Sequence, residues 1–287
     1  MPNRTLVIGA SGNIGSQVVE QLQVTGNHVR AMTRNPALTR FPQGVEIVKG
    51  DLTLPETLDE PLKGVDSVFL VWTAGPATIA PVVERIARSA RRIVLLTSPH
   101  KTPHPFFQQP NKMRALHETL ESQIAASGIE WTFLRPGMLA SNTRSWWAPQ
   151  IRKGNVVRWP LVNAPTAPIH ERDIAAVAIR ALLEDNHTAA EYVLTGPQSL
   201  TQAEQVLEIG RALGRLLRVE EISPDEARHE LLAIMPPFII EMLLAAWIAA
   251  IGQPAYVTDT VKEITGVQPR TMFEWATDHA QKLLHQA

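Results

Sequence analysis

Three glycines near the start of the chain follow an apolar segment at the spacing of a dinucleotide-binding loop. Gly9, Gly12 and Gly15 come directly after residues 5–8, and apolar residues then recur with the period of a helix. In such a loop the first glycine turns the chain out of a strand, the second lets N–H groups approach a pyrophosphate, and the third lets the helix pack close to the sheet. Because a helix N-terminus favours negative charge, we predict nucleotide phosphate here rather than a merely structural turn. The expected contacts are Gly9, Ser11, Gly12, Asn13, Ile14 and Gly15.

The end of the second predicted strand indicates which coenzyme the loop binds. An acidic residue at this position would bind the ribose 2′-hydroxyl of NAD(H). This chain has Thr33 and Arg34 instead, and no acidic residue lies between positions 26 and 42. The planar guanidinium of Arg34 suits a 2′-phosphate, although a solvated loop cation is the alternative. NADP(H) is therefore the predicted cofactor, and NAD(H) is less favoured.

Other candidate site residues follow the predicted strands, because ligands of open α/β sheets bind at the carboxyl ends of strands. Asp51 is expected near the adenine amino group or, alternatively, as the cap of a turn. Ser98 is a candidate catalytic hydroxyl or a loop cap. The remaining predicted cofactor contacts are Leu52, Val71, Trp72, Thr73, Thr97 and Pro136.

The elements that must position these residues alternate between apolar strands and amphipathic helices. This order predicts an α/β fold, a doubly wound parallel sheet with helices on both faces. The predicted strands are 5–8, 28–32, 45–49, 67–71, 92–96, 131–134 and 192–194. The predicted helices are 14–25, 55–62, 77–90, 111–126, 172–184, 202–213, 224–232, 238–250 and 258–265. We expect a nucleotide-binding domain over 1–140 and a small, mainly helical C-terminal lobe over 141–287, interleaved with the final strands of the sheet.

Composition narrows the classes of partner. The 287 residues have a formal net charge of -1, no cysteine and no basic block, so neither nucleic acid nor an anionic membrane is an expected partner. No metal site is expected, and the proline-rich segment 99–105, with His100 and His104, is interpreted as a surface loop. The apolar segment 238–251 is too short to span a bilayer and is interpreted as a buried or interface helix. We expect a cytoplasmic monomer or homodimer that acts on a small molecule.

Several segments together resemble one family of proteins. The most specific of them is Ser-Gly-Ile-Glu-Trp-Thr-Phe-Leu-Arg-Pro-Gly at 127–137 together with Asn142; the others are 9–15, 34–36, 50–51, 69–72 and 170–175. The chain thereby resembles the NmrA-like branch of the atypical short-chain dehydrogenase/reductase superfamily. This resemblance implies a Rossmann-like domain that binds NADP(H) over the carboxyl edge of its sheet. Such proteins include quinone and azo reductases, double-bond reductases and redox-sensing regulators.

The proton relay that is usual in this superfamily is missing. Neither Tyr192 nor Tyr256, the two tyrosines of the chain, is followed by lysine four residues later. Met113 and His117 occupy the corresponding helix positions, and His117 is a candidate catalytic residue that could bond the nicotinamide ribose or deliver a proton. A surface histidine is the alternative.

Two classes of function remain open. The first is an NADPH-dependent oxidoreductase that transfers hydride to a small planar electrophile of the quinone, azo, enone or imine type without the Tyr-x-x-x-Lys relay. The alternative is a non-catalytic NADP(H)-binding sensor that acts through protein contacts.

Overall fold

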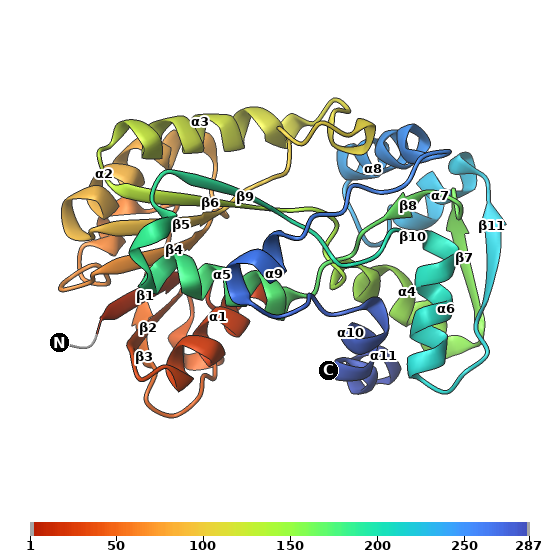
Figure 1. Ribbon diagram of the computed structural model, residues 1–287, viewed down its shortest axis with the longest axis horizontal. Coiled ribbons are helices and arrows are strands. Elements are labelled where there is room, and N and C mark those ends of the chain that lie inside the picture. Colours follow the sequence, from red (N-terminus) through yellow and green to blue (C-terminus); the bar gives the residue numbers. More distant parts are fainter. Residues whose placement is uncertain (1–2, 286–287) are drawn as a thin grey trace. The chain divides into compact units, whose positions relative to one another are not determined.

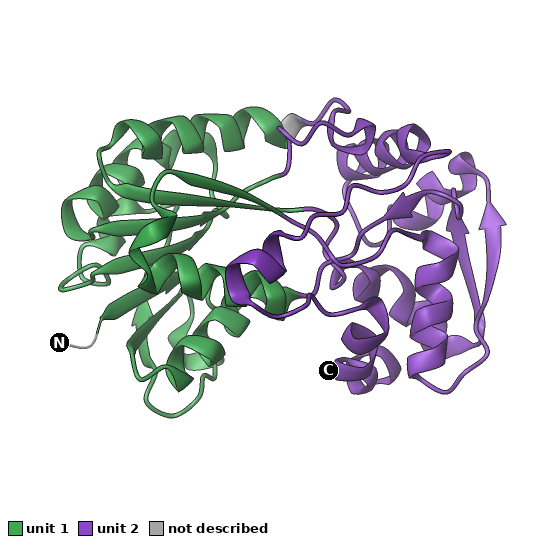
Figure 2. Ribbon diagram, in the orientation of Figure 1, with its two compact units in different colours: residues 1–98, 113–136, 171–193 green, residues 99–112, 137–170, 194–287 purple. Residues whose placement is uncertain are grey.

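In the computed structural model, which describes residues 3–285, the chain forms two compact units, each built from three segments. Unit 1 contains the residues up to 98, 113–136 and 171–193, and unit 2 contains 99–112, 137–170 and 194–287 (Figure 2). The division differs from a single boundary at residue 140, because 99–112 and 137–140 belong to unit 2 and 171–193 return to unit 1.

Unit 1 is built on a seven-stranded sheet in the order β3-β2-β1-β4-β5-β6-β9 (Figure 1). The pairings from β3 through to β6 are parallel. All seven predicted strands are present, as β1 Arg4–Ile8, β2 His28–Thr33, β3 Glu46–Lys49, β4 Ser67–Val71, β5 Arg92–Leu96, β6 Glu130–Pro136 and β9 Ala190–Leu194. The predicted Rossmann-like, doubly wound α/β fold is confirmed.

Helices cover both faces of this sheet (Figure 1). On one face, Leu6 and Leu70 pack in a common core with Val82 of α2 (Ile79–Ser89) and Leu120 of α3 (Lys112–Ala126). On the other face, α1 (Asn13–Val24) packs against α5 (Glu171–Leu183). Successive strand residues point to opposite faces, so a strand segment covered on both sides must be apolar, as residues 6–8 of β1 and 68–71 of β4 are. The segment predicted as a helix over 55–62 is a short 3-10 helix, Pro55–Leu58.

Unit 2 combines short helices with two small sheets, in which β7 (Val156–Pro160) pairs with β11 (Arg218–Ile222) and β8 (Pro165–Thr166) with β10 (Leu200–Thr201). Its core contains four buried tryptophans whose ring centroids lie 5.5 to 6.3 Å from their neighbours, Trp146, Trp147, Trp159 and Trp247. The helices are α4 Asn142–Lys153, α6 Gln202–Ala212, α7 Pro224–Leu231, α8 Pro237–Ala250, α9 Thr260–Thr265, α10 Met272–Asp278 and α11 Ala280–Leu284. The sequence pattern missed α4, α10, α11 and the four short strands.

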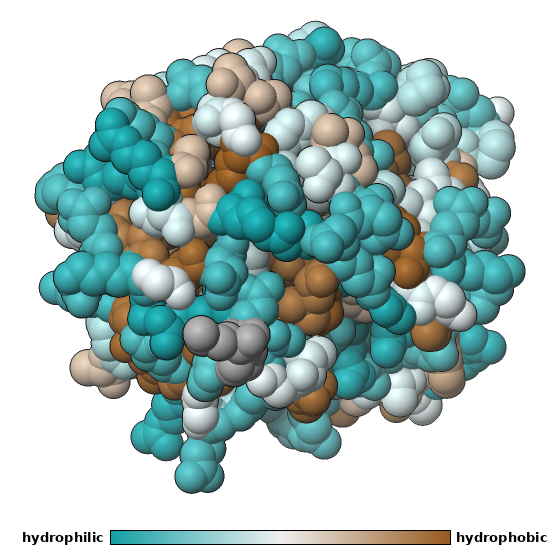
Figure 3. All heavy atoms as spheres, turned by 60° about the vertical axis from the view of Figure 1, so that its left-hand side comes forward, coloured by the Kyte–Doolittle hydropathy of each residue, from teal (hydrophilic) through white to brown (hydrophobic). Residues whose placement is uncertain are grey.

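The apolar segment interpreted as a buried helix is α8, and Leu243, Leu244 and Trp247 place it in the core of unit 2. Across residues 3–285, no helix has both the length and the hydrophobicity that a membrane span requires. On the face that Figure 3 shows, hydrophilic residues lie between several separate hydrophobic patches.

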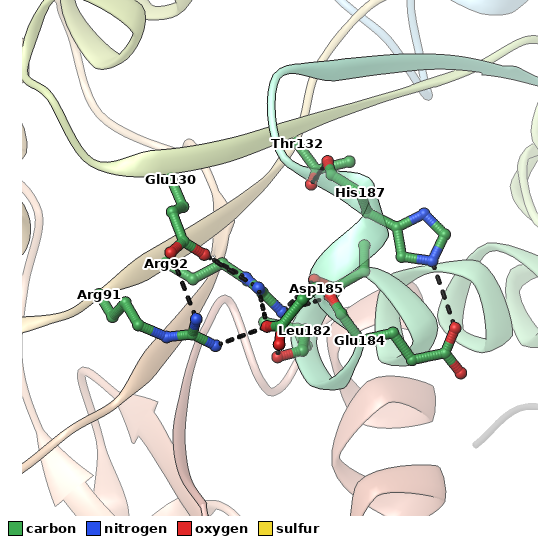
Figure 4. Close-up of polar contacts among 9 residues, drawn as sticks. Arg91, Arg92, Glu130, Thr132, Leu182, Glu184, Asp185 and His187 are labelled. Carbon is green, nitrogen blue, oxygen red and sulfur yellow. Dashed lines mark hydrogen bonds and ion pairs between the residues drawn. The ribbon is translucent and has the colours of Figure 1, made fainter.

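A buried arginine at the start of β5 holds the end of α5 in unit 1. The side chain of Arg92 is 2% exposed and pairs with the carboxylates of Glu130 and Asp185 (Figure 4). Its Nη1 also donates to backbone carbonyls of residues 181, 182 and 184. The last carbonyls of a helix lack partners within the helix, so this guanidinium stabilises the C-terminus of α5.

We expect Arg92→Ala to lower the free energy of unfolding by about 2 kcal/mol, because charge-assisted hydrogen bonds to the helix end are lost. The cost is limited, since the Asp185 side chain is 81% exposed and can be hydrated. Arg91→Ala is the matched control, because the Arg91 side chain is 55% exposed and its pairs are worth less than about 1 kcal/mol. Urea denaturation of the two variants measures the difference, and equal losses would contradict the role of Arg92.

Candidate functional site

The glycine-rich loop between β1 and α1 has the backbone geometry that the motif predicts. Gly9 has a φ of +86°, a conformation that side chains with a Cβ rarely adopt, so the chain can turn sharply out of β1. A Cβ added to Gly15 would lie 2.1 Å from the carbonyl oxygen of Gly9, which shows how closely α1 approaches the loop. The N–H of Gly12 donates to that same oxygen at 3.0 Å. Only glycines at 9 and 15 allow this approach, and the resulting cradle fits a pyrophosphate at the start of α1.

A cavity in unit 1 lies beside this loop, at the carboxyl ends of the first strands. It brings together nine of the predicted cofactor contacts, Gly9, Ser11, Gly12, Thr33, Arg34, Asp51, Leu52, Val71 and Thr73. Ile8, Met32 and Gly50 complete its lining. Residues far apart in the sequence therefore meet in one cavity, because parallel strands bring their carboxyl ends to one edge of the sheet.

The other predicted site residues lie outside this lining. Asn13, Ile14 and Gly15 form the first turn of α1, and the half-buried Trp72 packs beside the core under α2 and α3. Thr97 and Ser98 directly follow β5, Pro136 is the last residue of β6, and His117 lies in α3.

The charged residues that line the cavity are Arg34 and Asp51. Hydrogen bonds from the N–H and the hydroxyl of Thr53 lower the pKa of the Asp51 carboxyl below its ordinary value, and the positive charge of Arg34 lowers it further. The Asp51 carboxylate is thus ionised and caps a turn, which is one of the two roles predicted for it. Asp51 also lines the cavity. Arg34 also lines the cavity and is exposed to solvent.

A buried polar network lies where β5 and β6 end. The Thr97 hydroxyl is 2.6 Å from Oε1 of Glu121 and 3.2 Å from Nδ1 of His117. Arg135 donates to both carboxylate oxygens of Glu121, at 2.8 and 2.7 Å, and pairs with Glu191. Thr97, Glu121 and Arg135 are each at most 5% exposed. The structure thus brings together Thr97 and His117, while Ser98 meets the network through its carbonyl oxygen, which accepts from Arg135.

Sequence reasoning missed Glu121 and Arg135. One signal was available, because Arg135 directly follows the apolar residues Phe133 and Leu134 within a strand of a doubly covered sheet, where a charge needs a partner. The identity of that partner depends on tertiary contacts and could not be obtained from spacing.

Unit 2 contains a separate apolar pocket. It is lined by Gly137 and Met138 and by aromatic residues of two segments, with His104, Phe106, Phe107 and Tyr256 among them. His104 is 8% exposed and His100 3%, so the expectation of surface histidines in this loop was wrong. The Phe106 N–H donates to Nδ1 of His104, so Nε2 carries the proton and donates to the carbonyl of Pro254. His104 therefore forms a fixed wall of the pocket.

Comparisons with known proteins agree with this geometry. A family model described as NAD(P)H-binding matches residues 9–185. The chain belongs to the NAD(P)H-binding family. It is 39% identical over 283 residues to a (4-alkanoyl-5-oxo-2,5-dihydrofuran-3-yl)methyl phosphate reductase of Streptomyces griseus, covering 96% of this chain and 98% of that protein. It is also 32% identical to an NAD(P)H azoreductase of Xenophilus azovorans, with 96% and 97% of the two chains covered.

Among solved structures, the triphenylmethane reductase of Citrobacter sp. in complex with NADP(H) superposes with a TM-score of 0.78 at 19% identity, covering 97% of this chain and 99% of that one. The family model confirms the predicted NAD(P)-binding family, and the resemblance to the NmrA-like branch of the atypical short-chain dehydrogenase/reductase superfamily is consistent with it. The chain is an NAD(P)H-dependent reductase, as the first of the two expected function classes requires. The predicted nicotinamide cofactor is confirmed as NAD(P)H.

Proposed function

We propose that this reductase transfers hydride from NADPH to a small planar electrophile of the quinone, azo, enone or imine class, without a Tyr-x-x-x-Lys relay. The observation that carries this proposal is the single cavity lined by nine residues expected from the sequence to contact the cofactor. Such a cavity can hold NADPH, which supplies a hydride from its nicotinamide ring when bound. Electron-poor acceptors need less acid assistance than a plain ketone, which is consistent with the absence of the tyrosine.

The names of the relatives support this acceptor class. One acts on azo compounds, and the other reduces a 5-oxo-2,5-dihydrofuran with a 4-alkanoyl group, whose ring carries an electron-poor double bond. The cytoplasmic location and the monomeric or dimeric state stay predictions.

The test follows NADPH absorbance with one quinone, one azo dye, one cyclic enone and one cyclic imine, while calorimetry measures NADPH binding separately. We expect turnover with at least one of the four. Micromolar binding of NADPH without turnover of any acceptor would contradict the proposed chemistry and would leave the cofactor site intact.

We further propose that Arg34 binds the 2′-phosphate of NADPH. Arg34→Ala should raise the Kd for NADPH about tenfold and leave that for NADH nearly unchanged, because an exposed charge-assisted contact to phosphate is worth about 1.5 kcal/mol. Arg91→Ala, an exposed arginine just before β5, is the matched control and should change neither Kd. Equal losses for both coenzymes would remove the assignment of Arg34.

A further inference from the structure

We propose that Glu121, acting through the hydroxyl of Thr97, holds His117 in the tautomer with its proton on Nδ1, so that Nε2 is the nitrogen that exchanges protons with the acceptor. This assignment rests on the proposed function for the role of His117 in turnover. Glu121 and Thr97 are positioning residues in this proposal.

Helix geometry brings the three groups together in unit 1. His117 and Glu121 are four residues apart in α3, so their side chains lie one turn apart on the same helix face. Thr97 directly follows β5 and places its hydroxyl within hydrogen-bond distance of both, at 3.2 Å from the imidazole and 2.6 Å from the carboxylate.

The direction of each hydrogen bond follows from the donors available. The guanidinium of Arg135 is always protonated and only donates, so the Glu121 carboxylate that receives it at 2.7 and 2.8 Å is ionised and only accepts. The single proton of the Thr97 hydroxyl must then point to Glu121, in a short charge-assisted bond. With that proton committed, the Thr97 oxygen can only accept from His117, and Nδ1 must carry a hydrogen.

The alternative arrangement is costly. If Thr97 donated to Nδ1 of His117, its oxygen would face the ionised carboxylate at 2.6 Å with no proton between them. The site is 4–5% exposed at Thr97 and Glu121, so water would not screen two opposed acceptors. Arg135 fixes the charge state of Glu121 and is itself balanced by Glu191.

A neutral His117 therefore has its lone pair on Nε2. NADPH, when bound, would supply the hydride, and the reduced acceptor would then carry a negative charge that takes up one proton. The imidazolium form of His117 gives its Nε2 proton to that anion and returns to the neutral form with the proton on Nδ1. A proton from bulk solvent then restores the Nε2 proton, so each turnover consumes one solvent proton and the step balances.

The test uses two variants of the full-length protein, Thr97→Val, which removes the hydroxyl at nearly constant shape, and Thr97→Ser, which keeps it. Two-dimensional ¹H–¹⁵N spectra of histidine-labelled protein report the tautomer, and the His117 signals are assigned by their loss in His117→Gln. We expect the Nδ1–H form in the wild type and in Thr97→Ser, and a clear gain of the Nε2–H form in Thr97→Val. Thermal melting confirms that each variant is folded.

Kinetics provide the second readout. Thr97→Val should lower kcat about tenfold, and Thr97→Ser should restore most of it. An unchanged tautomer in Thr97→Val would overturn the proposal, and so would a changed tautomer with unchanged kcat. The tautomer measurement needs no turnover, so a failure of the proposed acceptor class is distinguishable from a failure of this inference.

Discussion

Replacement of Gly15 by alanine is expected to weaken NADPH binding about 100-fold. The added Cβ would lie 2.1 Å from the carbonyl oxygen of Gly9 and 2.7 Å from its carbonyl carbon, and neither backbone atom can rotate away. Helix α1 must then shift from the loop that we propose holds the pyrophosphate. Overpacking of this kind costs about 1–3 kcal/mol, and each 1.4 kcal/mol corresponds to a tenfold change in Kd.

Calorimetric titration with NADPH measures this effect. Gly154→Ala is the matched control, since Gly154 has extended backbone and a Cβ there would meet no atom within 4 Å among the described residues. The control should bind NADPH like the wild type. Wild-type affinity in Gly15→Ala would show that the loop does not hold the cofactor as proposed.

The second large effect is expected for Arg135→Ala, which should lower the free energy of unfolding by about 3–5 kcal/mol. The variant leaves the carboxylate of Glu121, which is 5% exposed as a side chain, buried without its guanidinium. Breaking a buried ion pair from one side is more damaging than removing both partners, because an uncompensated charge remains.

Urea denaturation compares this variant with Arg114→Ala, whose side chain is 46% exposed and pairs with Glu118 on the same helix. Such an exposed pair is worth about 0.3–0.5 kcal/mol. The double variant Arg135→Met with Glu121→Leu should recover much of the loss. A cost below about 1 kcal/mol for Arg135→Ala would mean that water reaches Glu121.

The parts of the molecule that sequence predicted well depend on local patterns. The strands of unit 1 are short apolar runs, and the glycine spacing at 9–15 states a backbone requirement directly, which the φ of Gly9 and the close approach at Gly15 bear out. The convergence of Arg34, Asp51 and Thr73 on one cavity followed from the rule that parallel strands present their carboxyl ends together.

The features that sequence missed depend on partners distant in the chain. In the sequence, Glu121 is one of several charged residues on an amphipathic helix. Its partners Arg135 and Thr97 come close to it only in the folded structure. The prolines around His100 and His104 indicated an exposed loop, but neighbouring aromatic side chains bury His104 through tertiary packing. The strands β7 and β11 are more than 50 residues apart in the chain, and each has only five residues. Segments this short carry too little pattern to predict their pairing.

The threading of the chain through its two units limits how this enzyme can be made or divided. The chain leaves or re-enters unit 1 after residues 98, 112, 136, 170 and 193. Helix α5 and strand β9 of unit 1 therefore leave the ribosome only after the first two segments of unit 2, residues 99–112 and 137–170. No single truncation yields either unit on its own, and a single crossover between two relatives splits at least one of the two units.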